Sequence, residues 1–279
     1  MADATDSHGS KPPRTDAAAS REIRFRGGGF RPQSNRWAGI AVFIVLIALV
    51  EIGLRQGWIS ALTLPRPSAV GATLWQLWES GNLTRHLFPS LSRLAVGGAM
   101  GALAGIAIGV AIGLFGLARA GLVPLVAAIF PIPKIALLPL FVIWFGIGEG
   151  SKYALIALGT FTPTVVATFG AVDNVDRTLI RMGQSFGLTW WSIVRKIVLP
   201  GAMPGILSGL RVSLAIAIIL LVAAEMLGAQ AGIGAYILEA GSLYDLDRLF
   251  AGVVILSALG VTLSWAMGLL EKRVLRWRA

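Results

Sequence analysis

Three ionisable side chains lie within long apolar stretches of this sequence, namely Lys134, Arg211 and Glu225. An ionisable residue at membrane depth is costly unless it is paired or hydrated, so each is a candidate for contact with a charged solute. Lys134 follows Pro131 and Pro133, and each proline removes a helix hydrogen bond. The carbonyl groups freed in this way persist inside a membrane only against protein or a water-filled cavity. These five residues are therefore predicted to line a hydrated path.

Two interpretations of the cations remain open. A hydrated path with fixed positive charge would attract anions. Alternatively, Lys134 and Arg211 only brace the protein, or Lys134 extends its ammonium group to an interface. Glu225 would compete as a partner for Lys134, although on a straight helix that begins at Pro204 it lies about 30 Å along the axis.

The residue types that most enzymatic chemistry requires are missing. None of the 279 residues is Cys and only two are His, His8 and His86, which excludes thiolate chemistry and leaves little for a metal cluster. No Gly-x-x-x-x-Gly-Lys-Ser/Thr phosphate loop occurs, and Gly183–Gly187 has the spacing Gly-x-Ser-x-Gly but follows no predicted strand, as a nucleophile elbow would. The stretch Gly146–Lys152 is glycine-rich but has the wrong spacing, and we predict a turn. We predict no catalytic residue, metal site or cofactor in this chain.

The composition is typical of a chain that lies mostly in lipid. Hydrophobic residues make up 56% and charged residues 14%, and the mean hydropathy is +0.76. Soluble domains average about 45–50% and about 25% respectively. The formal charge is +10, but the basic residues flank apolar runs and form no single stripe, which argues against a nucleic-acid partner. The sequence therefore predicts an all-α integral membrane protein.

Six apolar runs approach the length of about 20 residues that crosses a membrane. They cover residues 37–54, 91–117, 122–145, 153–171, 204–224 and 250–270. Residues 1–36 are polar and basic, so we predict a disordered cytoplasmic tail before a transmembrane domain over residues 37–279. Sixteen Lys and Arg residues fall in the tail and loops of one side and five on the other. This asymmetry predicts that both termini are cytoplasmic.

Two further patterns concern packing. Gly97, Gly101, Gly105, Gly109 and Gly113 repeat every four residues along one helix ridge. Because glycine lacks a Cβ atom, this ridge is predicted to let another helix approach closely, and a sliding role during gating is the alternative. Between the first two spans, Ser68 is predicted to cap a short amphipathic helix. That helix either lies on the membrane surface or docks a partner.

A loop over residues 176–200 is predicted to hold two short amphipathic helices. Asp176 can cap the first helix, and Gly187 can end it because glycine tolerates the left-handed conformation. Its apolar stripe comprises Leu179, Met182 and Phe186. Such a stripe outside the membrane must be buried against another subunit or the bilayer surface.

The second helix of this loop is predicted to begin after Thr189, which can cap it. Its apolar side comprises Trp190, Val194 and Ile197. Pro200 is predicted to end the helix and to hold Leu199 extended.

The same loop resembles the cytoplasmic "EAA" loop of ABC importer permeases. The resemblance rests on Gly187, nine residues, Ile197, one residue and Leu199-Pro200, whereas Arg181, Met182 and Gly183 replace the family's Glu-Ala-Ala. The flanking stretches that agree are Pro131–Lys152, Leu199–Arg211, Ala224–Met226 and Gly232–Gly234. They are similar to permeases for nitrate, taurine and aliphatic sulfonates, the sulfonate members in particular, over roughly residues 55–279.

This resemblance implies a type I ABC importer permease in a bacterial inner membrane, in contact with lipid. The permease would pair as a homodimer, with two ATP-binding subunits that carry ATP and Mg and an external solute-binding protein. The solute would be a small anion, foremost an aliphatic sulfonate or taurine, with nitrate or another small solute as the alternative. The implied contacts with the ATPase are Arg181, Ser185, Phe186, Gly187, Leu188, Trp190, Ile197, Leu199 and Pro200.

Two other classes of protein fit less well. A secondary transporter needs ion-coupling carboxylates in its spans and often an inverted repeat. Only Glu51 and Glu225 lie in or at the ends of predicted spans, and no repeat is visible. An intramembrane enzyme would need paired acids, a Ser–His pair or a metal cluster at membrane depth, and no His lies within a predicted span.

Overall fold

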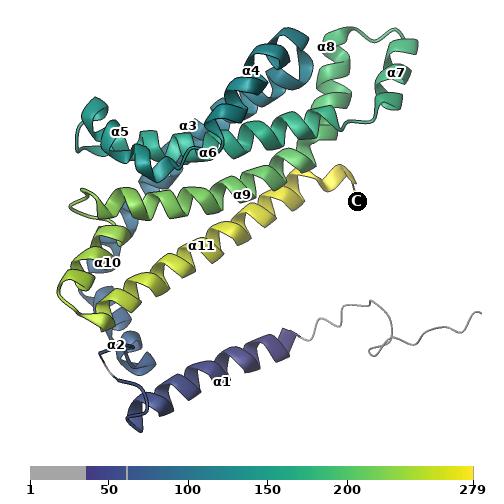
Figure 1. Cartoon of the computed structure of the whole chain (residues 1–279). Helices are drawn as coiled ribbons and strands as arrows, with labels where there is room; N and C mark the ends of the chain where they lie inside the picture. The colour runs from purple at the N-terminus through teal and green to yellow at the C-terminus, as the bar shows by residue number, and fades with distance from the viewer. Residues whose placement is uncertain (1–35, 61, 279) are drawn as a thin grey trace, which may run out of the picture. The chain divides into compact units, whose positions relative to one another are not determined.

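The computed structural model describes residues 36–60 and 62–278, and these form helices without any strand (Figure 1). The predicted tail, residues 1–36, lies outside the described residues except for Arg36. In chain order the elements are α1 (Arg36–Arg55), α2 (Pro67–Glu79), α3 (Asn82–Leu114), α4 (Gly116–Ile129), η1 (Lys134–Leu137), α5 (Leu138–Phe145), α6 (Glu149–Asp173), α7 (Arg177–Ser185), α8 (Trp190–Ile193), η2 (Val194–Val198), α9 (Leu199–Met226), α10 (Ile233–Ser242), α11 (Leu246–Val274) and η3 (Arg276–Arg278). The chain divides into two units between Leu46 and Ile47, and every helix after α1 belongs to the second unit.

Among the described residues, four helices are long and apolar enough to cross a membrane. They are α3, α6, the continuous helix Trp190–Met226 and α11, and a fifth is counted if α4 and the helical segment Lys134–Phe145 form one span. The axes of that pair differ by 89°. The span predicted over residues 122–145, in which prolines were expected to break helix hydrogen bonds, is thus bent sharply at its middle. Pro131 and Pro133 lie at the break, where each removes a helix hydrogen bond.

The central helix is α6, which packs against α3 on one side and α9 on the other (Figure 1). The glycines of the four-residue repeat in α3 all face it. A Cβ atom at Gly101 would lie 1.9 Å from Thr160 Oγ1 and 2.1 Å from the Ala157 carbonyl oxygen. The α6 residues opposite the repeat are themselves spaced four apart and are Ile156, Thr160, Thr164, Thr168 and Val172. Branched side chains of α6 thus fill the space left by the missing Cβ atoms.

The side of α6 that faces α9 is packed in the same way. A Cβ atom at Gly209 would lie 2.1 Å from Ala167 Cβ, and one at Gly205 would lie 2.6 Å from Ala171 Cβ. Backbones in contact over long stretches gain dispersion energy, which holds helices together where lipid removes the hydrophobic drive. The core therefore runs along both sides of α6.

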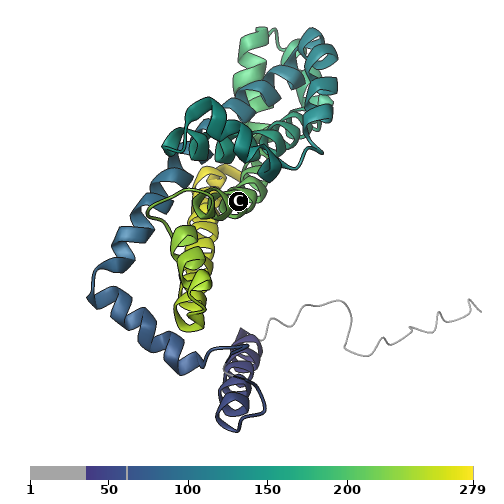
Figure 2. The same ribbon diagram turned by 60° about the vertical axis from the view of Figure 1, so that its left-hand side comes forward.

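The helix α2 forms where the sequence predicted it but begins differently. Its N-cap is Arg66, and Pro67 occupies the first turn. The expected cap Ser68 instead donates its hydroxyl to Glu51 Oε1 at 2.9 Å. Proline is favoured at the first helical position because its missing N–H needs no partner there, which moves the start of the helix ahead of Ser68. A turn at Gly81, with φ of +71°, then redirects the chain sharply into α3 (Figure 2).

Candidate functional site

The 176–200 loop folds around local capping contacts. Asp176 accepts a hydrogen bond from the Thr178 backbone N–H at 2.7 Å, and this bond lowers the pKa of the Asp176 carboxyl group. The Thr189 hydroxyl accepts from the Ser192 N–H at 3.4 Å at the start of α8. Between the two helices Gly187 has φ of +71°, a conformation in which a Cβ atom is unfavourable. These three features agree with the sequence prediction.

The end of the loop does not agree with it. Leu199 has φ of −63° and ψ of −47°, so it is helical and not extended. The chain runs from Trp190 to Met226 as one helix of 37 residues with a π-helical turn, η2, inside it. Pro200 lies in the first turn of α9. The π turn shifts the local hydrogen-bond register just before Pro200, so the helix continues past a residue that has no N–H to donate.

The loop has a buried side and an exposed side. On the buried side, Gly183 lies against Ile193 and Ile197, and a Cβ atom there would be 2.9 Å from Ile197 Cδ1. Ile180 and Ile197 pack on the core formed by Val172, Val175, Ile193, Val198, Ala202 and Ile206. Close packing therefore favours a small residue at position 183, although the Ile197 side chain could shift to admit a Cβ atom.

The exposed side of the loop is strongly apolar. Phe186 is 80% exposed, and the other exposed apolar side chains are Leu179, Met182, Leu188, Trp190 and Trp191. Arg181, Ser185 and Gly187 are also exposed, whereas Ile197, Leu199 and Pro200 are half-buried. Trp190 additionally lies 5.6 Å, centroid to centroid, from Phe115 between α3 and α4. Contiguous exposed apolar patches of this kind are typical of interaction sites.

The residues predicted to line a path do not meet in one site. Lys134 donates to the carbonyl oxygens of Phe130 and, at 3.3 Å, of Ile129, so it satisfies the free end of α4 at the proline break. Arg211 Nη2 lies 2.6 Å from Glu271 Oε2 on α11. Both cations therefore have hydrogen-bond partners within the chain, and Arg211 is also paired with an opposite charge.

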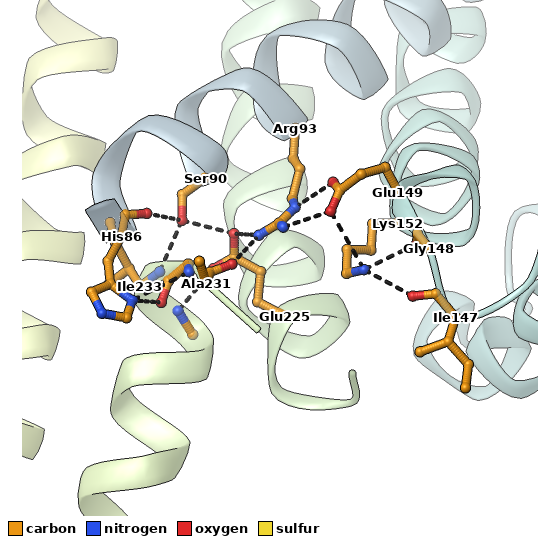
Figure 3. Close-up of polar contacts among 12 residues, drawn as sticks. His86, Ser90, Arg93, Ile147, Gly148, Glu149, Lys152, Glu225, Ala231 and Ile233 are labelled. Carbon is orange, nitrogen blue, oxygen red and sulfur yellow. Dashed lines mark hydrogen bonds and ion pairs between the residues drawn. The ribbon is translucent and has the colours of Figure 1, made fainter. Parts of the chain in front are cut away.

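Glu225 lies in a different environment, in which its partner is Arg93 of α3 (Figure 3). Arg93 Nη1 is 2.8 Å from Glu225 Oε1 and 2.7 Å from the Ala231 carbonyl oxygen. Its Nε and Nη2 atoms bind both oxygens of Glu149 at 2.6 and 2.7 Å. The side chains of Arg93 and Glu225 are 5% and 0% exposed, and that of Glu149 is 47% exposed.

Two more side chains complete this buried charge cluster, which we define as Ser90, Arg93, Glu149, Lys152 and Glu225. Ser90 donates to Glu225 Oε1 at 2.7 Å and accepts from the Ile233 N–H at 2.9 Å. Lys152 Nζ donates to the carbonyl oxygens of Ile147 and Gly148 (Figure 3). Two cations and two anions balance the charge, and the cluster joins α3, α6, α9 and the start of α10.

The Gly232–Gly234 segment allows this cluster to close. Gly232 has φ of +144°, and a Cβ atom there would lie 2.5 Å from Glu225 Cδ. The Gly234 N–H donates to Glu225 Oε2 at 2.8 Å. Only glycine lets the backbone approach the carboxylate so closely.

Sequence reasoning missed most of this cluster. Arg93 was not among the predicted site residues, Glu149 was interpreted as part of a turn, and Lys134 was considered as the partner of Glu225. The sequence did offer one signal for the cluster, the pair Ser90 and Arg93 near the start of a long apolar helix. Residues three positions apart lie on the same face of a helix, so these two form a polar face there.

Comparison with solved structures defines the class of protein. The chain is similar to an inward-facing conformation of the MetNI methionine ABC transporter, with a TM-score of 0.59 and 25% identity. The match covers 69% of this chain and 95% of that chain. A second crystal form of the same transporter gives a TM-score of 0.61. The fold is therefore that of a type I ABC importer permease.

Sequence relatives define the family. The chain matches a permease of Bacillus subtilis (strain 168) named for aliphatic sulfonates transport, at 35% identity over 95% of each chain. It also matches the taurine transport system permease protein of Escherichia coli (strain K12), at 33% identity over 92% of this chain and 91% of that one. Residues 101–276 match the family of binding-protein-dependent transport system inner membrane components, to which this chain belongs. It is a multi-pass inner-membrane transport component.

Proposed function

We propose that this permease imports an aliphatic sulfonate or taurine. The observation that carries the proposal is the similarity to the two relatives named for these solutes, which extends over more than nine-tenths of this chain. A relative of Chloroflexus aurantiacus named for riboflavin transport, 31% identical over 88% of this chain, keeps another small solute as the second candidate. The charges of Lys134 and Arg211 add little support for an anionic solute, because both side chains have partners within the chain.

Growth on a single sulfur source tests this proposal. A strain that lacks this gene and has no other importer for these solutes should fail to grow on taurine or ethanesulfonate and grow normally on sulfate. The intact gene should restore growth, and because both cations are already partnered, so should the Lys134→Met and Arg211→Met variants. Normal growth of the deletion strain on both sulfonates would exclude this substrate class.

We further propose that the chain works as a homodimer with two ATP-binding subunits and an external solute-binding protein. The exposed apolar side of the 176–200 loop would dock on the ATP-binding subunit. Two features support this: Phe186 and its apolar neighbours in the loop are largely exposed, and α8 continues into the spanning helix α9. A displacement of the docked loop would therefore move α9 directly.

Substitutions in the loop should uncouple transport while the protein still inserts. Burial of a large apolar side chain contributes about 1.5–3 kcal/mol, so Phe186→Asp should weaken assembly with the ATPase at least tenfold. Gly187→Val should also lower uptake, because a β-branched residue disfavours φ of +71°. Co-purification of the ATPase and solute uptake measure the two effects.

Matched variants serve as controls for these two substitutions. Asparagine tolerates the left-handed conformation and no atom lies within 4 Å of a Cβ at position 187, so Gly187→Asn should keep most uptake. Gln184→Asp adds the same charge as Phe186→Asp at an exposed polar position and should assemble normally. The docking proposal is contradicted if Phe186→Asp and Gly187→Val both assemble and transport like the wild-type protein.

A further inference from the structure

A polar pocket lies where α2, the start of α3, α10 and the start of α11 meet. Its volume is about 450 Å³, within the range of small-molecule sites. Arg85 of α3, Glu239 of α10 and Arg248 of α11 line it, together with the amides of Gln76 and Gln230. The pocket is at the Asn82 end of α3, whereas Trp190 of the 176–200 loop contacts Phe115 beyond the other end of that 33-residue helix. It is therefore about 50 Å from the proposed ATPase-docking surface.

The pocket carries unpaired charges of both signs. Arg248 Nε is 3.3 Å from Asp245 Oδ2. Arg85 and Glu239, by contrast, form no ion pair with each other or with any other described residue, although both line the same pocket. Opposite charges that face one space without touching leave room for a ligand that carries both charges.

An aromatic side chain forms part of the pocket wall. Tyr236 is only 9% exposed, and its hydroxyl has no hydrogen-bond partner among the described residues. Burial raises the pKa of Tyr236, so the hydroxyl stays protonated at neutral pH. The Tyr236 ring lies 5.2 Å from the ring of His86, which also lines the pocket. The hydroxyl oxygen is itself enclosed by protein, so the ring and not the hydroxyl forms part of the pocket wall.

We propose that this pocket binds a small zwitterion, such as an aminoalkanesulfonate, that bridges Arg85 and Glu239. The guanidinium groups of Arg85 and Arg248 would bind the acidic end of the solute, and Glu239 would bind its ammonium group. The lining is mostly polar, whereas the centre of a protein-docking site is apolar and built on aromatic anchors. The connection to import rests on the proposed function, but binding itself does not.

Direct binding to the full chain in lipid nanodiscs tests this site, with taurine as the probe and isothermal titration as the measurement. Taurine should bind at least tenfold more tightly than ethanesulfonate, which lacks the ammonium group, or ethylammonium, which lacks the sulfonate. Arg85→Gln and Glu239→Gln should each weaken taurine binding about tenfold. Glu239→Gln should also abolish the preference for taurine over ethanesulfonate.

Glu79→Gln, an exposed α2 variant outside the pocket lining, is the matched control and should bind taurine like the wild-type chain. Equal binding of taurine and ethanesulfonate by the wild-type chain would overturn the proposal. The proposal would also be overturned if the pocket variants changed only the affinity for the solute-binding protein. That result would assign the pocket to a protein partner. Growth of the deletion strain on sulfonates alongside intact taurine binding would refute the import proposal and leave the pocket assignment standing.

Discussion

Replacement of Arg93 with methionine should destabilise the protein by about 3–5 kcal/mol, because it leaves a buried carboxylate without its cation. Glu225 would keep its bonds from Ser90 and the Gly234 N–H but lose its only charged partner among the described residues. Glu149, which is half-exposed, can regain water and should contribute little to the loss. The free energy of unfolding in mixed micelles measures the effect.

Two comparisons isolate the buried charge as the cause. Adding Glu225→Gln to Arg93→Met removes the uncompensated charge and should recover about half of the loss or more. Arg211→Met breaks the ion pair between Arg211 and Glu271, whose side chains are 49% and 32% exposed respectively. Loss of this exposed pair should lower the free energy of unfolding by less than about 1 kcal/mol. Equal losses for Arg93→Met and Arg211→Met would contradict this account of the cluster.

A single methyl group at Gly101 should be among the most damaging small changes in the chain. In Gly101→Ala the new Cβ would lie 1.9 Å from Thr160 Oγ1 and 2.1 Å from the Ala157 carbonyl oxygen. The carbonyl belongs to the α6 backbone, so the two helices must separate along their contact. Overpacking costs about 1–3 kcal/mol and occasionally more; we expect the upper end, measured as the yield of folded protein and its free energy of unfolding.

The neighbouring position Gly98 provides the control on the same helix. No atom lies within 4 Å of a Cβ built there, so Gly98→Ala should change stability by no more than about 0.5 kcal/mol. Thr160→Ala should not rescue Gly101→Ala, because the Ala157 carbonyl remains in place. Rescue by Thr160→Ala would show that the side chain, and not the backbone contact, sets the spacing between α3 and α6.

Much of the fold was predictable from patterns that span a few residues. The Asp176 and Thr189 caps and the left-handed Gly187 could be predicted because a cap depends on backbone groups two or three positions away. The continuation of α8 into α9 was not predictable from Pro200 alone, because the π turn before it changes the hydrogen-bond register.

The role of the glycine repeat was only partly predictable from the sequence. Its spacing of four indicated a ridge for close packing, but not the helix that fills it. The matching residues Thr160, Thr164 and Thr168 of α6 are also four apart, so the complementary signal was present in the sequence. Each ridge by itself fits many partners, and only the arrangement of the helices shows which two ridges meet.

The sequence alone determined that this protein lies in a membrane, where its apolar segments run and how its 176–200 loop turns, because these depend on local composition and on contacts between near neighbours. Only the tertiary structure decided the charge pairing. Arg93 and Glu225 are 132 residues apart in the chain, and Lys134, the expected competitor, satisfies the carbonyl groups of its own helix break instead. A buried charge binds whichever opposite charge the helix packing brings within about 3 Å, and that packing is set by backbone contacts along α6.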